Sequence, residues 1–514
     1  MIFNAFSIAF LTRLIECGLK LGSAACTGPT KRPGTRRFEG TMTLHKLKLL
    51  RLFALILPLV LLSIAPVASA ADWPPTLDKK NTVTRSLDGR IIERYTHGPR
   101  DAWGYTKTLP AEWAYSPAME TGKDGQNHNS FYVLAPKKTR KHAPLCVVLH
   151  SANRTAYDYL GFQSLGRKLD GNDPASVATH TSDECYGLFL SSTNAEWYGW
   201  SAARYESAKY AGKPAPAEKR IFDTIDWVAG KYAVDRNRIY LTGLSMGGCG
   251  TLGLGVPHGE VFAAVAAFVP AGTEYMMSRL GFPPPPAPGA SQAEKDLWAK
   301  QVSFPGRPDP PVLVDVSAQN DNWSKTQPVL LQAAEAGRLP LILSWGLYGH
   351  ATYSYLMAKY PEPAVVLAFP WMEIRKDSAY PVFTHATSDQ RSPWRTPPTE
   401  FDASGQMNAY FRWKSQQDRP SRLVMQLWIA HPAVKNAPPA MPDSSTADVT
   451  LRRLQHFKVQ PGETYGWELA RNGKPVASGK IAPDAANLLT IPQVALTTEV
   501  SELSVRVEKQ KTGK

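Results

Sequence analysis

One short run of residues constrains the fold more than any other part of the chain. It reads Arg238-Ile239-Tyr240-Leu241-Thr242-Gly243-Leu244-Ser245-Met246-Gly247-Gly248. β-prone residues lead into Gly-x-Ser-x-Gly and glycines follow, which indicates a strand, a sharp turn and a helix. The residue at the tip of such a turn adopts unusual backbone angles, and its neighbours must be small if the serine oxygen is to stand clear of the sheet. Ser245 is therefore a candidate nucleophile; the alternative is a tight turn whose serine only caps a helix.

Apolar strands and amphipathic helices alternate on both sides of this run. The expected strands are 131–135, 145–149, 187–191, 239–242, 261–269, 311–316 and 339–345, with helices at 218–231 and 327–336. Unbroken apolar strands separated by helices are typical of a mostly parallel sheet covered on both faces. We therefore predict an α/β fold for this part of the chain.

The chain has 514 residues, which is long enough for more than one domain. The segment 271–310 contains four consecutive prolines and is too long for a plain connector, so it is either a pocket wall or lid, or a solvated excursion. Later residues alternate apolar and polar, as in the strands expected at 406–413 and 422–430, with Gly-containing turns between some of them. We expect an irregular lead-in at 71–130, an α/β catalytic domain at 131–377 with the insertion 271–310, and a β-sandwich-like accessory domain at 378–510.

Residues 42–70 have the pattern of an export signal. A basic stretch at 45–51 precedes the almost entirely apolar run 52–67, and Ala68-Ser69-Ala70 is a small-x-small cleavage site. We expect a secreted or periplasmic protein. Residues 1–41 would then precede the true start, the alternative being an N-terminal anchor. No apolar run after residue 70 approaches the ~18 residues that a membrane span needs.

The charge of the chain does not indicate a nucleic-acid partner. Without residues 1–70 the net charge falls from +14 to +7, with 49 basic and 42 acidic residues, and the excess is spread along the chain. The three cysteines that remain show no metal-ligand spacing, and we expect neither a metal nor a cofactor.

A serine hydroxyl needs a histidine to take its proton and an acid to orient that histidine. This strand–serine–helix run resembles that of the α/β-hydrolases, in which the acid follows the second strand after the nucleophile and the histidine follows the third. These positions fall to Asp321 and His350. Asp315, inside the strand, is the rival acid; otherwise it is a hydrogen-bonded core carboxylate.

Two backbone N–H groups must hold the oxyanion that forms on the substrate. One should come from Met246, directly after the nucleophile, and the other from Ser151 or Ala152, in the loop after strand 145–149. Aromatic residues at the same edge of the sheet are candidates for substrate contact, with core packing as the alternative for each: Trp197, Trp200, Trp323 and Tyr348.

The run 235–248 resembles the α/β-hydrolase serine esterases, in the branch that includes feruloyl and acetyl-xylan esterases, esterase D and secreted polyhydroxyalkanoate depolymerases. The resemblance covers about 130–362 and is specific around Ser245. It implies a Ser245–Asp321–His350 triad that hydrolyses an ester through an acyl-enzyme. Two features depart from that branch: His150 is followed by Ser151 where glycine is usual, and the β-rich C-terminal part lies outside the resemblance.

We therefore expect an exported serine hydrolase, a carboxylesterase whose substrate is an ester, with acyl groups on plant polysaccharide as one option. Three alternatives stay open. A prolyl-oligopeptidase-type peptidase shares the fold, but the residues before the α/β part are too few for the propeller of that family. The others are a polyester depolymerase and a polysaccharide-binding protein without turnover.

Overall fold

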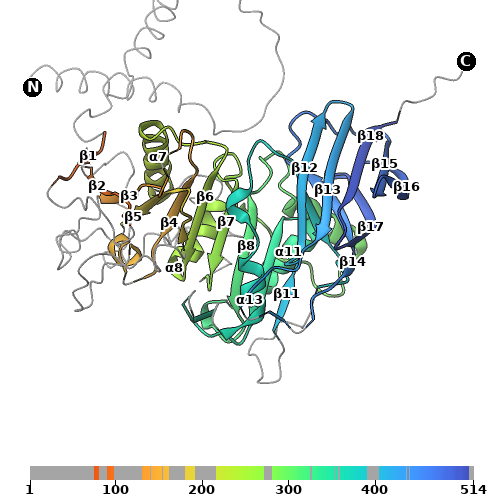
Figure 1. Cartoon of the computed structure of the whole chain (residues 1–514). Helices are drawn as coiled ribbons and strands as arrows, with labels where there is room; N and C mark the ends of the chain where they lie inside the picture. The colour runs from red at the N-terminus through yellow and green to blue at the C-terminus, as the bar shows by residue number, and fades with distance from the viewer. Residues whose placement is uncertain are drawn as a thin grey trace, which may run out of the picture. The chain divides into compact units, whose positions relative to one another are not determined.

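The apolar runs that the sequence marks as buried strands lie side by side in one mixed sheet, which is seen in the computed structural model of Figure 1. The strand order is β1-β2-β3-β5-β4-β6-β7-β8-β9-β11. Neighbouring strands from β5 to β9 run parallel, whereas β1, β2, β3 and β11 pair antiparallel with their neighbours. The strand bounds are β1 Thr76–Leu77, β2 Ile92–Thr96, β3 Ser130–Leu134, β4 Leu145–Leu149, β5 Tyr186–Leu190, β6 Ile239–Leu244, β7 Ala264–Phe268, β8 Val312–Ala318, β9 Leu341–Gly346 and β11 Gly405–Met407.

The structure describes only part of the chain. The described residues are 74–79, 89–97, 130–138, 140–152, 154–160, 180–191, 216–270, 280–324, 327–352, 355–356, 359–389, 404–435, 437–438 and 440–508. The expected export signal and the residues before it lie outside this set. No helix among the described residues is long and apolar enough to cross a membrane.

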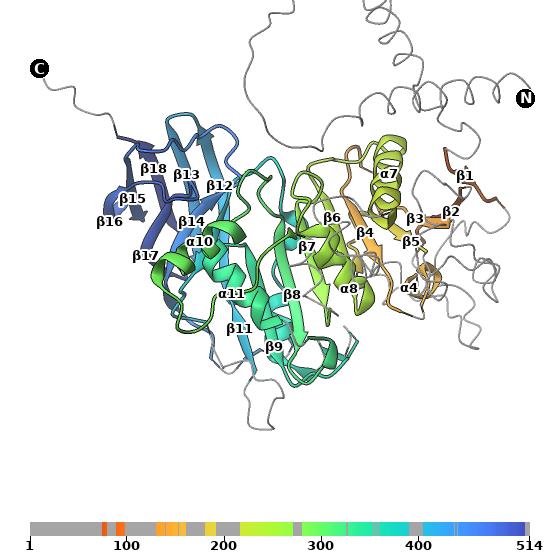
Figure 2. The ribbon, with the colours of Figure 1, turned by 180° about the vertical axis from the view of Figure 1, so that it is seen from behind.

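Helices cover both faces of the sheet because successive strand residues point to opposite sides. On one face, side chains such as Val147 and Leu241 pack with helices α7, α8, α10 and α11; the last two lie in front of the sheet in Figure 2. On the other face, Val148 and Tyr240 pack with α4 and α13. The helices span α4 Ala156–Tyr159, α7 Pro216–Lys231, α8 Met246–Gly250, α10 Gln292–Val302, α11 Gln327–Gly337 and α13 Pro361–Leu367, and π-helix η2 at Thr251–Gly255 continues α8.

The C-terminal part is built from antiparallel strands, as the alternating pattern predicts. One sheet has the order β10-β14-β17 and the other β12-β13-β18-β15-β16. Asn472 and Gly473 both have positive φ in the turn between β15 and β16, which is the backbone that Asn-Gly favours. The strands span β10 Tyr380–Thr384, β12 Phe411–Arg419, β13 Arg422–Ile429, β14 Ser444–Arg452, β15 Tyr465–Arg471, β16 Lys474–Ile481, β17 Thr490–Thr497 and β18 Ser501–Val507.

The structure differs from the sequence expectations in two places. The strand expected at 406–413 is two strands, because Asn408 has a φ of 58° and turns the chain between them. The first, β11, joins the α/β sheet beside β9, and the second, β12, pairs with β13. The lead-in 71–130, expected to be irregular, contributes β1 and β2 to the edge of the large sheet.

The C-terminal strands share a core with the α/β sheet. One continuous cluster of buried side chains extends from Val148 and Val314 on the sheet to Leu427 and Val505 in the C-terminal part. Contacts accordingly group Ala71–Lys514 as one compact unit.

Candidate active site

Ser245 occupies a sharp turn between strand β6 and helix α8. Its φ of 58° and ψ of −118° form a backbone conformation that is costly for any residue with a side chain. The Ser245 N–H still donates to the Phe268 carbonyl of β7 at 2.9 Å, and its carbonyl accepts from Cys249 N–H at 3.0 Å. The backbone of Ser245 thus ends the strand and begins the helix, and it holds the side chain at the carboxyl edge of the sheet.

The glycines around Ser245 are needed because other backbone lies against them. A Cβ atom at Gly247 would stand 2.0 Å from the Leu149 carbonyl oxygen, and one at Gly243 would stand 2.4 Å from the Gly247 carbonyl carbon. At Gly248 it would stand 2.8 Å from the Phe268 carbonyl oxygen. The sequence suggests that the neighbours of Ser245 must be small. The structure gives the reason, because β4, β6 and β7 approach the start of α8 closely.

His350 lies between Ser245 and Asp321. Its Nε2 is 2.8 Å from Ser245 Oγ, and its Nδ1 is 2.6 Å from Asp321 Oδ2. In the neutral imidazole, Nδ1–H donates to the carboxylate, which leaves Nε2 to accept the serine proton. The Asp321 side chain is buried whereas that of His350 is 38% exposed, so the acid is shielded from water and the imidazole faces the solvent side. The three residues follow β6, β8 and β9, the strands that the sequence order indicated.

Asp315 does not contact the histidine. It is fully buried within β8, where its Oδ1 accepts from Ser317 Oγ at 2.8 Å and its Oδ2 accepts from Gln327 Nε2. Desolvation raises the pKa of Asp315 to about 8, opposed by the Ser317 hydrogen bond. It therefore has the contacts of a core carboxyl group.

Two backbone contacts position the acid and base loops, and the sequence did not reveal them. The Asp321 Oδ1 atom accepts from the Trp323 N–H at 3.0 Å, which fixes the carboxylate. Asn320 Oδ1 accepts from the Gly349 N–H at 2.8 Å, and Gly349 has a φ of 62°. Asn320 precedes the acid and Gly349 precedes the base, so this bond joins the two loops directly.

The three candidates for oxyanion donors differ in the hydrogen bonds of their backbone N–H groups. Met246 is the first residue of α8, so its N–H lies outside the helical hydrogen-bond ladder. The Ser151 N–H already donates to the Tyr159 hydroxyl at 3.1 Å, and Ser151 Oγ donates to the Leu244 carbonyl at 3.2 Å. Ala152 follows it in the same loop, and among these two residues its N–H is the better candidate for the second donor.

Tyr159 anchors this loop, and no sequence signal pointed to it. Its hydroxyl contacts both the backbone N–H and the Oγ of Ser151. Its ring stacks on His180 with centroids 4.9 Å apart. Burial raises the pKa of Tyr159 to about 12, so the hydroxyl stays protonated. His150, at the end of β4, contacts the Ser151 carbonyl through Nδ1 at 2.8 Å, which also holds the loop.

The aromatic candidates have different environments. Trp323 is 47% exposed and follows Asp321 closely, so its ring can face a substrate. Tyr348 is buried, donates to the Trp345 carbonyl at 3.0 Å and packs on Tyr360, so the packing alternative fits it better. Trp197 and Trp200 lie outside the described residues. No cluster of metal-binding side chains occurs among the residues that the structure describes.

Comparison with known proteins places this geometry in context. Residues 189–349 match a family model described as "Putative esterase". The match includes Ser245 and Asp321 and ends one residue before His350. The resemblance to a serine esterase is thereby confirmed. The matched segment lies within the α/β fold that the strand pattern predicts.

One similar curated protein is acetylxylan esterase A of Emericella nidulans, 25% identical over 156 residues. The match covers 30% of this chain and 46% of the relative, so the chain spans less than half of that protein. Two similar solved structures are the fluorophosphonate-binding serine hydrolase F of Staphylococcus aureus and the acetyl xylan esterase of Aspergillus awamori. They are 15% and 16% identical, with TM-scores of 0.31 and 0.26. The first alignment covers 47% of this chain and 91% of the other, and the second covers 38% and 68%.

Proposed function

We propose that the protein is a serine carboxylesterase in which Ser245 is the nucleophile, His350 the general base and Asp321 the acid that orients it. One observation carries the proposal: an unbroken hydrogen-bonded path runs from Asp321 Oδ2 through His350 to Ser245 Oγ. Such a path lets the hydroxyl lose its proton as it attacks, which a lone serine cannot do at neutral pH.

The reaction then has two halves. Ser245 Oγ attacks the ester carbonyl carbon while His350 Nε2 takes its proton, and the N–H groups of Met246 and Ala152 hold the oxyanion. His350 returns the proton to the departing alcohol, which leaves the acyl group on Oγ. In the second half His350 takes a proton from water, the hydroxide attacks the acyl carbon, and the carboxylic acid is released as Ser245 regains its proton.

We further propose that the substrate is an acyl group esterified to plant polysaccharide. Support comes from the acetylxylan esterase name of the curated relative. The exposed Trp323 ring, two residues after the acid, is suited to packing on a sugar or an aryl group.

Labelling with a fluorophosphonate probe tests the nucleophile. The purified chain should react, and Ser245→Ala should lose both the label and at least ~10³-fold of its p-nitrophenyl acetate hydrolysis. If the folded wild-type chain takes no label, the protein is a binding protein that keeps a hydrolase fold, and the esterase proposal is wrong.

A pair of matched variants tests the acid. Asp321→Asn should lower kcat by about 10²- to 10⁴-fold, because the amide no longer stabilises the imidazolium and favours the wrong tautomer. Asp315→Asn, the control, should keep kcat within a few-fold because Asp315 does not touch His350. The opposite ranking of the two variants would transfer the acid role to Asp315.

A panel of substrates separates the enzymatic alternatives. Acetylated xylan and methyl ferulate should be cleaved in preference to Pro-containing peptides and to polyester films. Preferential release of peptide fragments would instead favour a prolyl-oligopeptidase-type peptidase, and release of soluble oligomers from the film would favour a depolymerase.

We also propose that residues 42–70 direct export, on the basis of their basic, apolar and small-x-small pattern. N-terminal sequencing of protein recovered outside the cytoplasm should begin at Ala71. Recovery of the chain only inside the cytoplasm, with 42–70 still attached, would refute export.

A further inference from the structure

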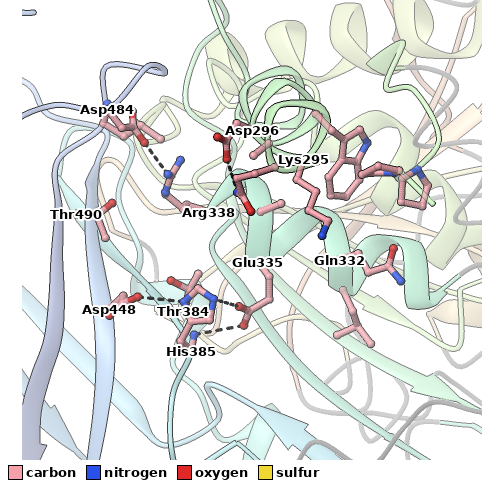
Figure 3. A pocket seen from close by; sticks show the side chains of 18 of the residues that line it. Lys295, Asp296, Gln332, Glu335, Arg338, Thr384, His385, Asp448, Asp484 and Thr490 are labelled. Atoms are coloured by element: carbon pink, nitrogen blue, oxygen red, sulfur yellow. Dashed lines mark hydrogen bonds and ion pairs between the residues drawn. The ribbon is translucent and has the colours of Figure 1, made fainter. Parts of the chain in front are cut away.

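A large cavity lies away from the three catalytic candidates, where helices α10 and α11 face the sheet β10-β14-β17 (Figure 3). Its volume is about 920 Å³, at the upper end of the range usual for small-molecule sites. Ser245, Asp321 and His350 do not line it. The wall joins the α/β part to the β-rich part, and the boundary between two such parts is a common place for a ligand site.

One part of the cavity lining is apolar and held in place by a hydrogen bond. Pro285, Pro286 and Trp298 line it. The Trp298 indole N–H donates to the Pro283 carbonyl at 3.0 Å, which ties the proline run to α10. Proline rings and indole faces are rigid and apolar, so this wall is suited to the C–H faces of a ring-shaped ligand.

The opposite wall is polar, and its charges are largely compensated by one another. Figure 3 shows Arg338 of the segment after α11 paired with Asp484, at 2.6 Å. His385 lies between Asp448, at 3.0 Å, and Glu335, at 3.5 Å. Carboxylates held in this way keep further lone pairs with which they accept hydrogen bonds.

The sum of these charges limits the chemistry of the ligand. The lining carries four carboxylates and two basic side chains, with His385 beside them: Asp296, Glu335, Asp448 and Asp484 against Lys295 and Arg338. The lining therefore has more carboxylates than basic side chains, which disfavours an anion. Its many acceptors, together with the amides of Gln292 and Gln332, suit a ligand rich in hydroxyl groups.

We propose that this cavity binds a short neutral oligosaccharide, with its sugar rings against Pro285, Pro286 and Trp298 and its hydroxyls toward the acidic wall. The site is separate from ester hydrolysis and does not depend on it. It gives the chain a second point of attachment to a polysaccharide.

Isothermal titration calorimetry on the full-length Ser245→Ala variant tests the site without turnover. Xylohexaose or cellohexaose should give saturable binding, and a xylo-oligosaccharide that carries glucuronic acid should bind at least tenfold more weakly because the wall is acidic. No saturable binding of either neutral hexaose would overturn the proposal. The experiment measures binding by an inactive variant, so an absence of binding would not contradict the esterase proposal. Likewise, an absence of esterase activity would not contradict binding in the cavity.

Two substitutions on α10 locate the ligand. Ala299→Phe, added to Ser245→Ala, fills part of the cavity and should weaken neutral-saccharide binding at least tenfold. Ala293→Phe is the matched control, because Ala293 is exposed on the same helix and does not line the cavity. Gln332→Ala is a milder test at an exposed lining position that should fold normally, with binding several-fold weaker. Wild-type affinity in both Ala299→Phe and Gln332→Ala would exclude this cavity.

Discussion

At the scale of single residues, the hydrogen bond between Asn320 and Gly349 joins the loop that carries Asp321 to the loop that carries His350. Asn320→Ala removes the acceptor for the Gly349 N–H, so the loop that carries His350 should sample more conformations. One hydrogen bond contributes about 0.5–1.5 kcal/mol, and we expect kcat for p-nitrophenyl acetate to fall roughly 2- to 10-fold with KM nearly unchanged. Steady-state kinetics of the variant measure both parameters.

Asn320→Asp is the control for this prediction. Its carboxylate can accept the same N–H, so kcat should recover most of the loss seen in Asn320→Ala. Equal kcat in Asn320→Ala and the wild type would show that the bond does not position His350.

Asp315 should make the stability of the protein depend on pH. Burial raises its pKa to about 8 in the folded chain, whereas an unfolded aspartate titrates near its ordinary value of 3.8. The folded state therefore holds a proton that the unfolded state releases. The contribution of Asp315 to stability should be fully present below pH ~4 and be lost as the pH rises to about 8. Asp315→Asn is neutral at every pH and can donate to Ser317 while accepting from Gln327. We expect it to match the wild type at pH 4 and to exceed it at pH 7 by an amount on the order of a few kcal/mol.

Urea denaturation at a series of pH values measures this difference. The diagnostic quantity is the gap between the two proteins, because other carboxylates titrate in both. A gap that stays constant from pH 4 to 8 would mean that Asp315 is ionised in the folded chain.

At the scale of elements, the junction of β4, β6 and α8 tolerates only glycine at position 247. Gly247→Ala places its methyl group 2.0 Å from the Leu149 carbonyl oxygen, and rigid backbone cannot move aside without separating β4 from α8. We expect a loss of at least about 2 kcal/mol of stability and more than tenfold of kcat, because Ser245 and the oxyanion donors shift together. Thermal melts and p-nitrophenyl acetate kinetics check the two effects.

Gly230→Ala is the matched control on α7. A Cβ atom at Gly230 meets nothing within 4 Å, so alanine should stabilise the helix by roughly 0.5–1 kcal/mol and leave kcat unchanged. If Gly247→Ala behaved like Gly230→Ala, the close packing of the turn would not be needed.

The sequence predicts those elements that are buried on both faces. β4 is an unbroken apolar run, and β8 is apolar apart from Asp315 and Ser317. The order of strands after Ser245 led to Asp321 and His350, and in the structure His350 contacts both Ser245 and Asp321. β16 is exposed along nearly its whole length and has no apolar periodicity, so nothing in its residues marks it as a strand. The hydrogen bonds of Tyr159 and Asn320 depend on how the segments after the strands fold over the sheet. The spacing of residues along the sequence does not predict these contacts.

At the scale of the whole molecule, two buried arginines at the end of β14 join the β-rich part to the α/β part. Arg453 donates to the carbonyls of Ala263 at 3.1 Å and Pro310 at 3.0 Å, and its guanidinium lies over the Tyr380 ring. Arg452 pairs with Asp309 at 3.2 Å, and the same carboxylate accepts from the Arg453 N–H at 2.6 Å. Burial lowers the pKa of Arg453, because desolvation disfavours the charged guanidinium.

Arg453→Met should therefore weaken the whole junction. It leaves buried carbonyls without their donor, and we expect a loss of about 3–5 kcal/mol. The wild type should melt in one transition, because the two parts share a core; the variant should melt at lower temperature, with the β-rich part separating first. Differential scanning calorimetry measures this, and Arg506→Met on β18, where the side chain is 71% exposed, should melt like the wild type. Two separate transitions in the wild type would show that the β-rich part folds independently. Arg452 and Arg453 would then stabilise only the contact between two independently folded domains.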